Sequence, residues 1–210
     1  HDTEAEVREV IAAHFARFAR KLPPQLVVSR LLPVIPTLSS DSSHHVRASL
    51  ASAVMGLAPI VGTQVTIEKL LPLFIGQLQD EFPEVRLNLI ESMHTLETVL
   101  GVEHLGSSLL PALAALADDR QWRVRQATIQ YIPQLSKQLG PGFVEEYFLP
   151  LFVNWLQDCV HAICESAIDS ARELAIHFGR EWATTQLVPK VLLARQPANY
   201  RDRLTWLATV

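Results

Sequence analysis

The pattern of apolar and polar positions in this chain repeats every 39 residues. Each period contains two apolar stretches, separated by a short polar segment and closed by a glycine. Proline and glycine mark the same places in successive periods, at Pro33, Pro72, Pro111, Pro150 and Pro189 and at Gly62, Gly101, Gly140 and Gly179. A fixed period of this length indicates an array of similar units, each of which packs on its neighbours.

The second apolar stretch of each period predicts an amphipathic helix, which we call helix B. Its apolar columns are Val46, Val85, Val124 and Ile163, followed by Leu57, Leu96, Leu135 and Leu174. The two columns lie 11 residues apart, which places them on one helical face. Helix B is expected to begin near His44, Pro83, Trp122 and His161, and to end where the column glycine forms a left-handed cap.

The first apolar stretch predicts helix A, which contains the column proline. In the first complete period helix A is expected from about Pro24 to about Ser39. A proline inside a helix removes one backbone hydrogen bond, so each helix A should bend at the same place. Two helices in a period of about 40 residues indicate HEAT repeats. The expected fold class is therefore all-α, an α-solenoid of HEAT repeats.

The predicted repeats divide the chain without insertions. We expect complete repeats at 23–62, 63–101, 102–140 and 141–179, a half repeat with helix B alone at 1–22, and a truncated repeat at 180–210. The chain would then be a piece of a longer array. Both of its ends should expose apolar side chains, among them Val7, Val10 and Ile11.

Composition narrows the classes of function. No apolar run approaches the roughly 18 residues of a membrane span, and a net charge of −4 gives no general attraction to nucleic acid or anionic lipid. We therefore expect no nucleic acid and no membrane among the partners. The sequence has no nucleophile-plus-base arrangement and no phosphate-binding loop, so we expect neither catalysis nor a cofactor. Two cysteines cannot form a disulfide framework, which suits a reducing compartment.

A ladder of charged residues follows the A-to-B turns. Aspartates precede helix B at Asp2, Asp41, Asp80, Asp119 and Asp158, and arginines stand six residues after the first four of them, at Arg8, Arg47, Arg86 and Arg125. An aspartate here can accept backbone N–H groups, and the arginine can reach the aspartate of a neighbouring repeat. The ladder is interrupted by Cys164, in place of an arginine, and by Pro197, in place of an aspartate. Weaker coupling between repeats is expected at both places.

Two histidine-containing groups have a structural interpretation that is simpler than a functional one. Cys159, His161 and Cys164 are residue types that bind metals, but three ligands at irregular spacing favour no metal site. His44 and His45 are adjacent, so their side chains should point apart on a helix and lie in a solvated turn.

The turn before Trp122 carries the strongest candidate for a binding surface. Trp122 occupies a turn position beside Arg123, and aromatic and arginine side chains are enriched at the centres of protein interfaces. Tyr200 and Arg203 lie near the equivalent turn of the last repeat. The alternative is that the tryptophan packs on its own array, and the sequence leaves both interpretations open.

The residues of these repeats also resemble one family. The strings HHVRASLASAVMGLAPIVG, TIEKLLPLFIGQLQDEFPEVRLNLI, WRVRQATIQYIPQLSKQLG and FGREWATTQLVPKVL are similar, in order and without gaps, to the C-terminal half of the HEAT-repeat scaffold (A) subunit of protein phosphatase 2A. The resemblance implies a non-catalytic scaffold that binds the phosphatase catalytic subunit on its A-to-B turns and a regulatory B subunit mostly on repeats before this segment. It also implies residence in the cytoplasm, with the nucleus as a second location.

Carried across by position, the resemblance implies a partner-binding set of Trp122, Arg123, His161, Tyr200 and Arg203. Four of these match the family's residue types. His161 departs from its usual tyrosine and Cys164 from its arginine, so the middle contact should differ from that of the family. Two other functions are less consistent with the sequence. A nuclear transport receptor should show acidic inner helices and irregular repeat lengths, and a HEAT-like DNA glycosylase needs a basic groove; the sequence shows none of these features.

Overall fold

The computed structural model describes residues 2–100 and 102–193, and within these ranges every regular element is helical. The chain divides into two compact units, His1–Leu109 and Leu110–Val210, which are described separately. The long helix α9 (Val102–Ala117) runs across the boundary between them. The fold class is an all-α solenoid of helix pairs, as the period predicts.

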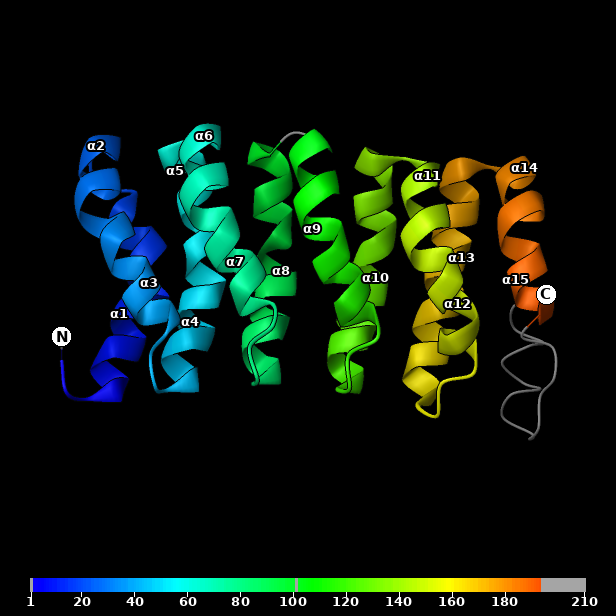
Figure 1. Ribbon diagram of the computed structural model, residues 1–210, viewed down its shortest axis with the longest axis horizontal. Coiled ribbons are helices and arrows are strands. Elements are labelled where there is room, and N and C mark those ends of the chain that lie inside the picture. Colours follow the sequence, from blue (N-terminus) through cyan, green and yellow to red (C-terminus); the bar gives the residue numbers. More distant parts are fainter. Residues whose placement is uncertain (1, 101, 194–210) are drawn as a thin grey trace. The chain divides into compact units, whose positions relative to one another are not determined.

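In the first unit, helices α1, α4 and α8 lie side by side as the layer of B helices, and the A segments lie against them (Figure 1). The helix bounds are α1 Ala5–Ala19, α2 Pro24–Leu26, η1 Val27–Leu31, η2 Leu32–Val34, α3 Ile35–Ser39, α4 His44–Val54, η3 Met55–Leu57, α5 Ala58–Val61, α6 Thr63–Val65, η4 Thr66–Leu70, α7 Leu71–Gln77 and α8 Pro83–Val99.

In the second unit, α10 packs against α13 and α12 against both α13 and α15, so that B and A helices again form two layers. The bounds are α10 Trp122–Leu139, α11 Pro141–Phe143, η5 Val144–Phe148, α12 Leu149–Leu156, α13 His161–Phe178, α14 Arg180–Trp182, η6 Ala183–Leu187 and α15 Val188–Leu193. Helix B therefore begins at the four residues that the sequence predicts, His44, Pro83, Trp122 and His161.

The apolar columns of helix B form the core of each unit. Val46 and Val85 in the first unit, and Val124 and Ile163 in the second, are completely buried. The leucine column, from Leu57 to Leu174, is at most 5% exposed. Because neighbouring B helices pack on one another, burial is continuous from repeat to repeat within a unit. Helix α1 leaves Val7, Val10, Ile11 and Phe18 exposed, in agreement with the expected apolar surface on this helix.

A π-helical turn precedes the column proline in helix A. The segments η1, η4, η5 and η6 each begin six residues before a column proline, at Pro33, Pro72, Pro150 and Pro189. In each, the residue before the proline donates its N–H to the carbonyl five residues back, as Leu32 does to Val27. The proline ring clashes with the carbonyl four residues back in an α-helix, and the wider turn relieves that clash. The bend predicted at the proline thus takes the form of a π turn ahead of it, except in α9, where Pro111 lies within an uninterrupted helix.

Glycines end helix B in three described repeats, but not in the left-handed cap that the sequence predicts. Gly62, Gly140 and Gly179 have φ between 81° and 89° with ψ between 169° and 177°. This region of positive φ and extended ψ is essentially restricted to glycine. The extended ψ is needed because the same glycine is also the residue before the next A helix, so it must reverse the chain at once. Gly101 lies outside the described residues.

Replacing Gly140 with alanine should lower the free energy of unfolding by about 1–3 kcal/mol, because a Cβ is strained in this conformation even where space is free. Gly142 is the matched control. It lies two residues later in a helical turn, with no atom near its would-be Cβ, and alanine there should be neutral or stabilising by roughly 0.5–1 kcal/mol. Urea unfolding of both variants checks this, and equal destabilisation by the two substitutions would contradict it.

Within the described residues, none of the helices is both long enough and apolar enough to cross a membrane.

Candidate partner-binding turns

The A-to-B turns are closed by aspartate side chains. Asp41, Asp80, Asp119 and Asp158 each accept the backbone N–H of the residue two positions later, with N–O distances of 2.8–2.9 Å. The accepting residue lies before helix B rather than at its N-cap, so the carboxylate shapes the turn that leads into the first helical residue. His44, Pro83, Trp122 and His161 are these first residues.

Three arginines each connect a turn to the next repeat within the same unit. Arg47 donates to the Asp80 carboxylate (Nε–Oδ2 2.7 Å) and to the carbonyl oxygen of Asp41, six residues before it. Arg8 bonds Asp41 in the same way, and Arg125 bonds Asp158. Each guanidinium thus joins its own turn to the following one, as the ladder predicts.

Two members of the ladder lie on either side of the boundary between the units. Arg86 is buried and donates to the carbonyl of Asp80 in its own unit, and the Asp119 carboxylate accepts the N–H of Gln121 in the other. The link expected between Arg86 and Asp119 stays a prediction.

Cys164 occupies the arginine position of the fourth repeat. It is buried, and its thiol donates to the carbonyl oxygens of Asp158 and Leu156 at 3.5 and 3.6 Å. The Asp158 carbonyl is the equivalent of the one that the ladder arginines bond in their own repeat. The thiol therefore reproduces the bond within the repeat. It points into the backbone, and no metal-binding arrangement with Cys159 and His161 is formed among the described residues.

Ion pairing shifts the ionisation of the ladder. The hydrogen bond from Arg8 is the main reason that the pKa of Asp41 lies below its ordinary value, and the same bond raises the pKa of Arg8. For Asp80, burial tends to raise the pKa, but the bonds from Arg47 and from the Phe82 N–H outweigh it, so the net shift is downward. The bond to Asp80 raises the pKa of Arg47.

Acid should therefore weaken the fold through this ladder. Because Asp41 and Asp80 have lowered pKa values in the folded chain, the unfolded chain takes up protons first as the pH falls below its aspartate pKa of about 3.9. The ladder's stabilisation is complete above that pH and is lost as the pH falls further. Urea midpoints measured from neutral pH to about pH 3 should fall more steeply for the wild type than for Asp41→Asn. Asp169→Asn, which changes an exposed pair, should keep the wild-type slope.

In the second unit, the turn at the start of α10 places an aromatic and a cationic side chain together. Trp122 is half-buried, and the guanidinium of the exposed Arg123 lies 4.6 Å from the centre of its ring, a cation–π contact. His161 begins the neighbouring helix α13, is exposed, and has its Nε2 3.3 Å from Glu165 Oε1. Since α10 and α13 pack side by side, these two helix starts form adjacent positions on one edge of the unit. Tyr200 and Arg203, the rest of the predicted set, lie outside the described residues.

In the first unit the equivalent turns differ from what the sequence predicts. The rings of His44 and His45 do not point apart, because their centres are 4.0 Å from each other. His44 also stacks flat on Phe82 of the next turn, with ring centres 4.1 Å apart and planes at 4°. The part played by Phe82 was not predicted. The available signal was its place directly before Pro83, which makes it a neighbour of His44 once the repeats are stacked.

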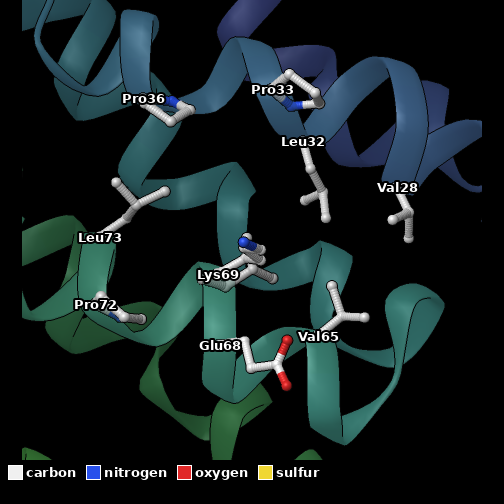
Figure 2. Close-up of a pocket in the computed structure, with 10 residues that line it drawn as sticks. Val28, Leu32, Pro33, Pro36, Val65, Glu68, Lys69, Pro72 and Leu73 are labelled. Carbon is white, nitrogen blue, oxygen red and sulfur yellow. The ribbon is translucent and has the colours of Figure 1, made fainter.

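An apolar hollow of about 490 Å³ lies between the A segments of the first unit (Figure 2). Val28 and Pro33 approach it from η1 and η2, and Val65 and Pro72 from the following repeat. Its charged lining residues are Glu68 and Lys69. The hollow runs along the A helices rather than along the turns, and so it is separate from the residues that the sequence predicts for partner binding.

Comparison with known proteins shows the family. Residues 75–192 match the family described as PIK3R4-like, middle domain, over more than half of the chain. The chain belongs to this family. Residues 1–62 of this chain match a second family, described as PPP2R1A-like HEAT repeat. The two matches leave between them only residues 63–74, and together they make this chain a HEAT-repeat protein.

This chain is also similar to the beta isoform of the 65 kDa regulatory (A) subunit of human serine/threonine-protein phosphatase 2A, at 44% identity over 65 residues. This match covers 29% of the chain and 11% of the relative, so the chain spans only a small part of that protein. Among solved structures, Cex1p aligns with 95% of the chain and 44% of its own length at a TM-score of 0.65 and 18% identity. A designed armadillo repeat protein aligns at 0.54 and 18%, covering 100% of the chain and 94% of the design. These structures show the fold alone.

Proposed function

We propose that this chain is a non-catalytic scaffold that binds the catalytic subunit of protein phosphatase 2A on its A-to-B turns and assembles it with a regulatory B subunit. The observation that carries the proposal is the 44% identity to the beta isoform of the human phosphatase 2A 65 kDa regulatory (A) subunit. The PPP2R1A-like match of residues 1–62 also supports it.

The geometry of the second unit suits such a role. Trp122 provides an aromatic surface at the start of α10, and Arg123 holds a positive charge over it. Side chains of this kind dominate binding energy when they enter a pocket on a partner. The aspartate and arginine bonds beneath them fix the turn, so that little ordering is needed on binding. His161 extends the surface to the next turn, and Tyr200 and Arg203 would extend it further.

The scaffold acts through effective concentration rather than chemistry, because two partners held on one array meet more often than free ones. The B subunit would contact mainly repeats that precede this segment in the phosphatase family. We place the complex in the cytoplasm and also in the nucleus, which imaging of the tagged chain would test.

The test is a calorimetric titration of the whole chain with a phosphatase 2A-type catalytic subunit. We expect saturable one-to-one binding. The human beta isoform is the positive control, and circular dichroism establishes that the chain is folded. A folded chain that gives no binding where the control binds would overturn the proposal.

The PIK3R4-like match favours a second candidate function, in which the same scaffold holds the partners of that family instead. The discriminating experiment is competition, in which the chain is added to a complex of another PIK3R4-like middle domain with one of its partner proteins. If the second candidate is correct, the chain should displace that middle domain from the partner. If the phosphatase is the partner of the chain, the complex should stay intact.

A further inference from the structure

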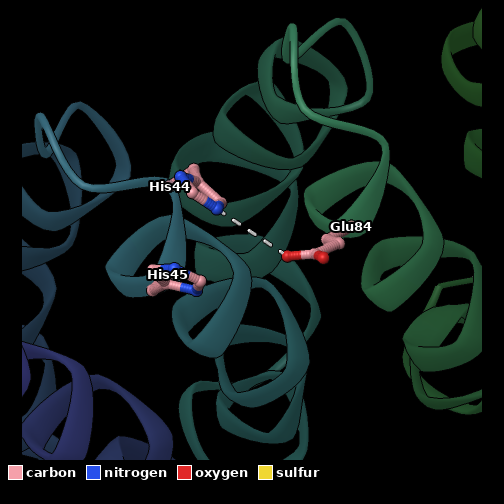
Figure 3. A group of neighbouring side chains, drawn as sticks. All are labelled: His44, His45 and Glu84. Atoms are coloured by element: carbon pink, nitrogen blue, oxygen red, sulfur yellow. Dashed lines mark ion pairs between the residues drawn. The ribbon is translucent and has the colours of Figure 1, made fainter.

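The turns of the first unit bring two imidazoles and a carboxylate together. His44 and His45 are the first two residues of α4, and Glu84 is the second residue of α8 in the next repeat. One ligand atom from each of the three lies within 4.8 Å of the others. Figure 3 shows the His44 ring turned toward Glu84, with His45 beside it, and the distance from His44 Nε2 to Glu84 Oε2 is 3.9 Å.

Packing fixes one of the three groups and leaves the other two adjustable. The His44 ring is stacked on Phe82, which holds its plane and directs Nε2 to the gap between the repeats. The side chain of Glu84 is 62% exposed, and His45 is also exposed. These two can change rotamer without disturbing the core, whereas His44 provides a fixed first ligand.

The charges around the group favour a cation more than the helix ends oppose it. The N-termini of α4 and α8 carry partial positive charge, which works against a bound cation. The guanidinium of Arg47, which lies over the Phe82 ring, is already bonded to Asp80 and lies 3.8 Å from Glu81, so its charge is compensated. Glu84 adds a full negative charge at the site itself. Neutral imidazole, which both histidines can offer, is the form that binds metals.

We propose that His44, His45 and Glu84 form a binding site for a divalent transition metal, with Zn²⁺ as the expected ion. Two histidines and one glutamate are a known zinc ligand set, with water in the remaining position. At ligand distances of about 2.0–2.1 Å, tetrahedral ligand atoms lie roughly 3.4 Å apart, so the side chains must move inward by about an ångström. The bound ion would link α4 to α8 across a repeat boundary. This proposal does not depend on the proposed scaffold function.

The test uses the whole chain, freed of metal by a chelator and titrated with zinc chloride at slightly alkaline pH. We expect one zinc ion per chain, and at least tenfold weaker binding in His44→Ala, His45→Ala and Glu84→Gln. His161→Ala is the matched control, because His161 starts α13 as His44 starts α4 but has only a glutamate of its own helix beside it. Cys159→Ser controls for binding at the exposed thiol.

A second readout is thermal unfolding. Zinc that binds only the folded chain should raise the melting temperature of the wild type and of His161→Ala, but not of Glu84→Gln, whose exposed substitution leaves the fold intact. Absence of zinc binding by the folded wild type, or binding that all three variants at His44, His45 and Glu84 retain, would overturn the proposal.

Discussion

Replacing Arg47 with alanine is expected to lower the free energy of unfolding by about 3–5 kcal/mol, the range for removing one partner of a buried ion pair. The Arg47 and Asp80 side chains are each 10% exposed, and their carboxylate–guanidinium pair is bidentate. Removal of the guanidinium leaves the Asp80 carboxylate and the Asp41 carbonyl without that donor in a poorly solvated turn. Urea unfolding followed by far-UV circular dichroism measures the change.

Arg172→Ala is the matched control. Its ion pair with Asp169 joins side chains that are 61% and 70% exposed on one helix, so the substitution should change stability by less than about 0.5 kcal/mol. If Arg47→Ala were as mild as Arg172→Ala, the ladder would be a by-product of stacking rather than one of its causes.

Replacing Trp122 with alanine is expected to weaken binding of the phosphatase catalytic subunit by roughly 30-fold or more, corresponding to about 2 kcal/mol for a buried interface anchor. The physical reason is that the substitution removes a large, preordered apolar surface and also the ring over which the Arg123 guanidinium is held. Calorimetric titration of the variant against the wild type measures the loss.

Two observations would show that the loss belongs to the interface. The far-UV spectrum of Trp122→Ala should match that of the wild type, because the side chain is only half-buried. Ile176→Ala removes another exposed apolar side chain, 83% accessible on α13 and far along the helix from its first turn, and should leave binding unchanged. Equal weakening by both variants would point to a general apolar attraction and against a specific turn contact.

The sequence predicts most of this fold because each repeat restates the same pattern. One period alone would leave the start of helix B uncertain, but four aligned copies place it at a single column, and the structure starts the helices at those residues. The apolar columns are buried for the same reason. The sequence pattern shows the features that all repeats share. These shared features are the helix starts and apolar positions that packing between repeats requires.

The π turns were not predicted. Buried residues are five positions apart at Val27 and Leu32, but at the next π turn Thr66 is followed by two buried leucines, Leu70 and Leu71, so a spacing of four is present as well. Because an α-helix also places buried residues three or four apart, the apolar spacing alone does not distinguish a π turn from an α-helix. The expected bend rested on the proline alone and ignored the residues before it.

The candidate site was predicted less completely, because its details depend on which side chains meet across repeats. Trp122 and Arg123 were found from composition at a turn, and the structure adds their stacking. The contact of His44 with Phe82 joins residues from different repeats, and helical geometry within one repeat pointed the opposite way. A side chain at a helix start has fewer constraints from its own helix, so its neighbour in the next repeat decides where it lies.

The cysteine in the arginine column has a mechanical consequence for the second unit. Arg125 fastens the repeat of α10 to that of α13, whereas the Cys164 thiol reaches back to carbonyls of its own repeat. A stretching force carried along residues 110–193 would therefore load the Arg125–Asp158 ion pair before α13, and after α13 the hydrogen bond from the Trp182 indole to the Glu145 carboxylate. Helices α14 and α15 should separate from α13 at a lower force than α13 separates from α10. The second unit should therefore extend first at its last described repeat.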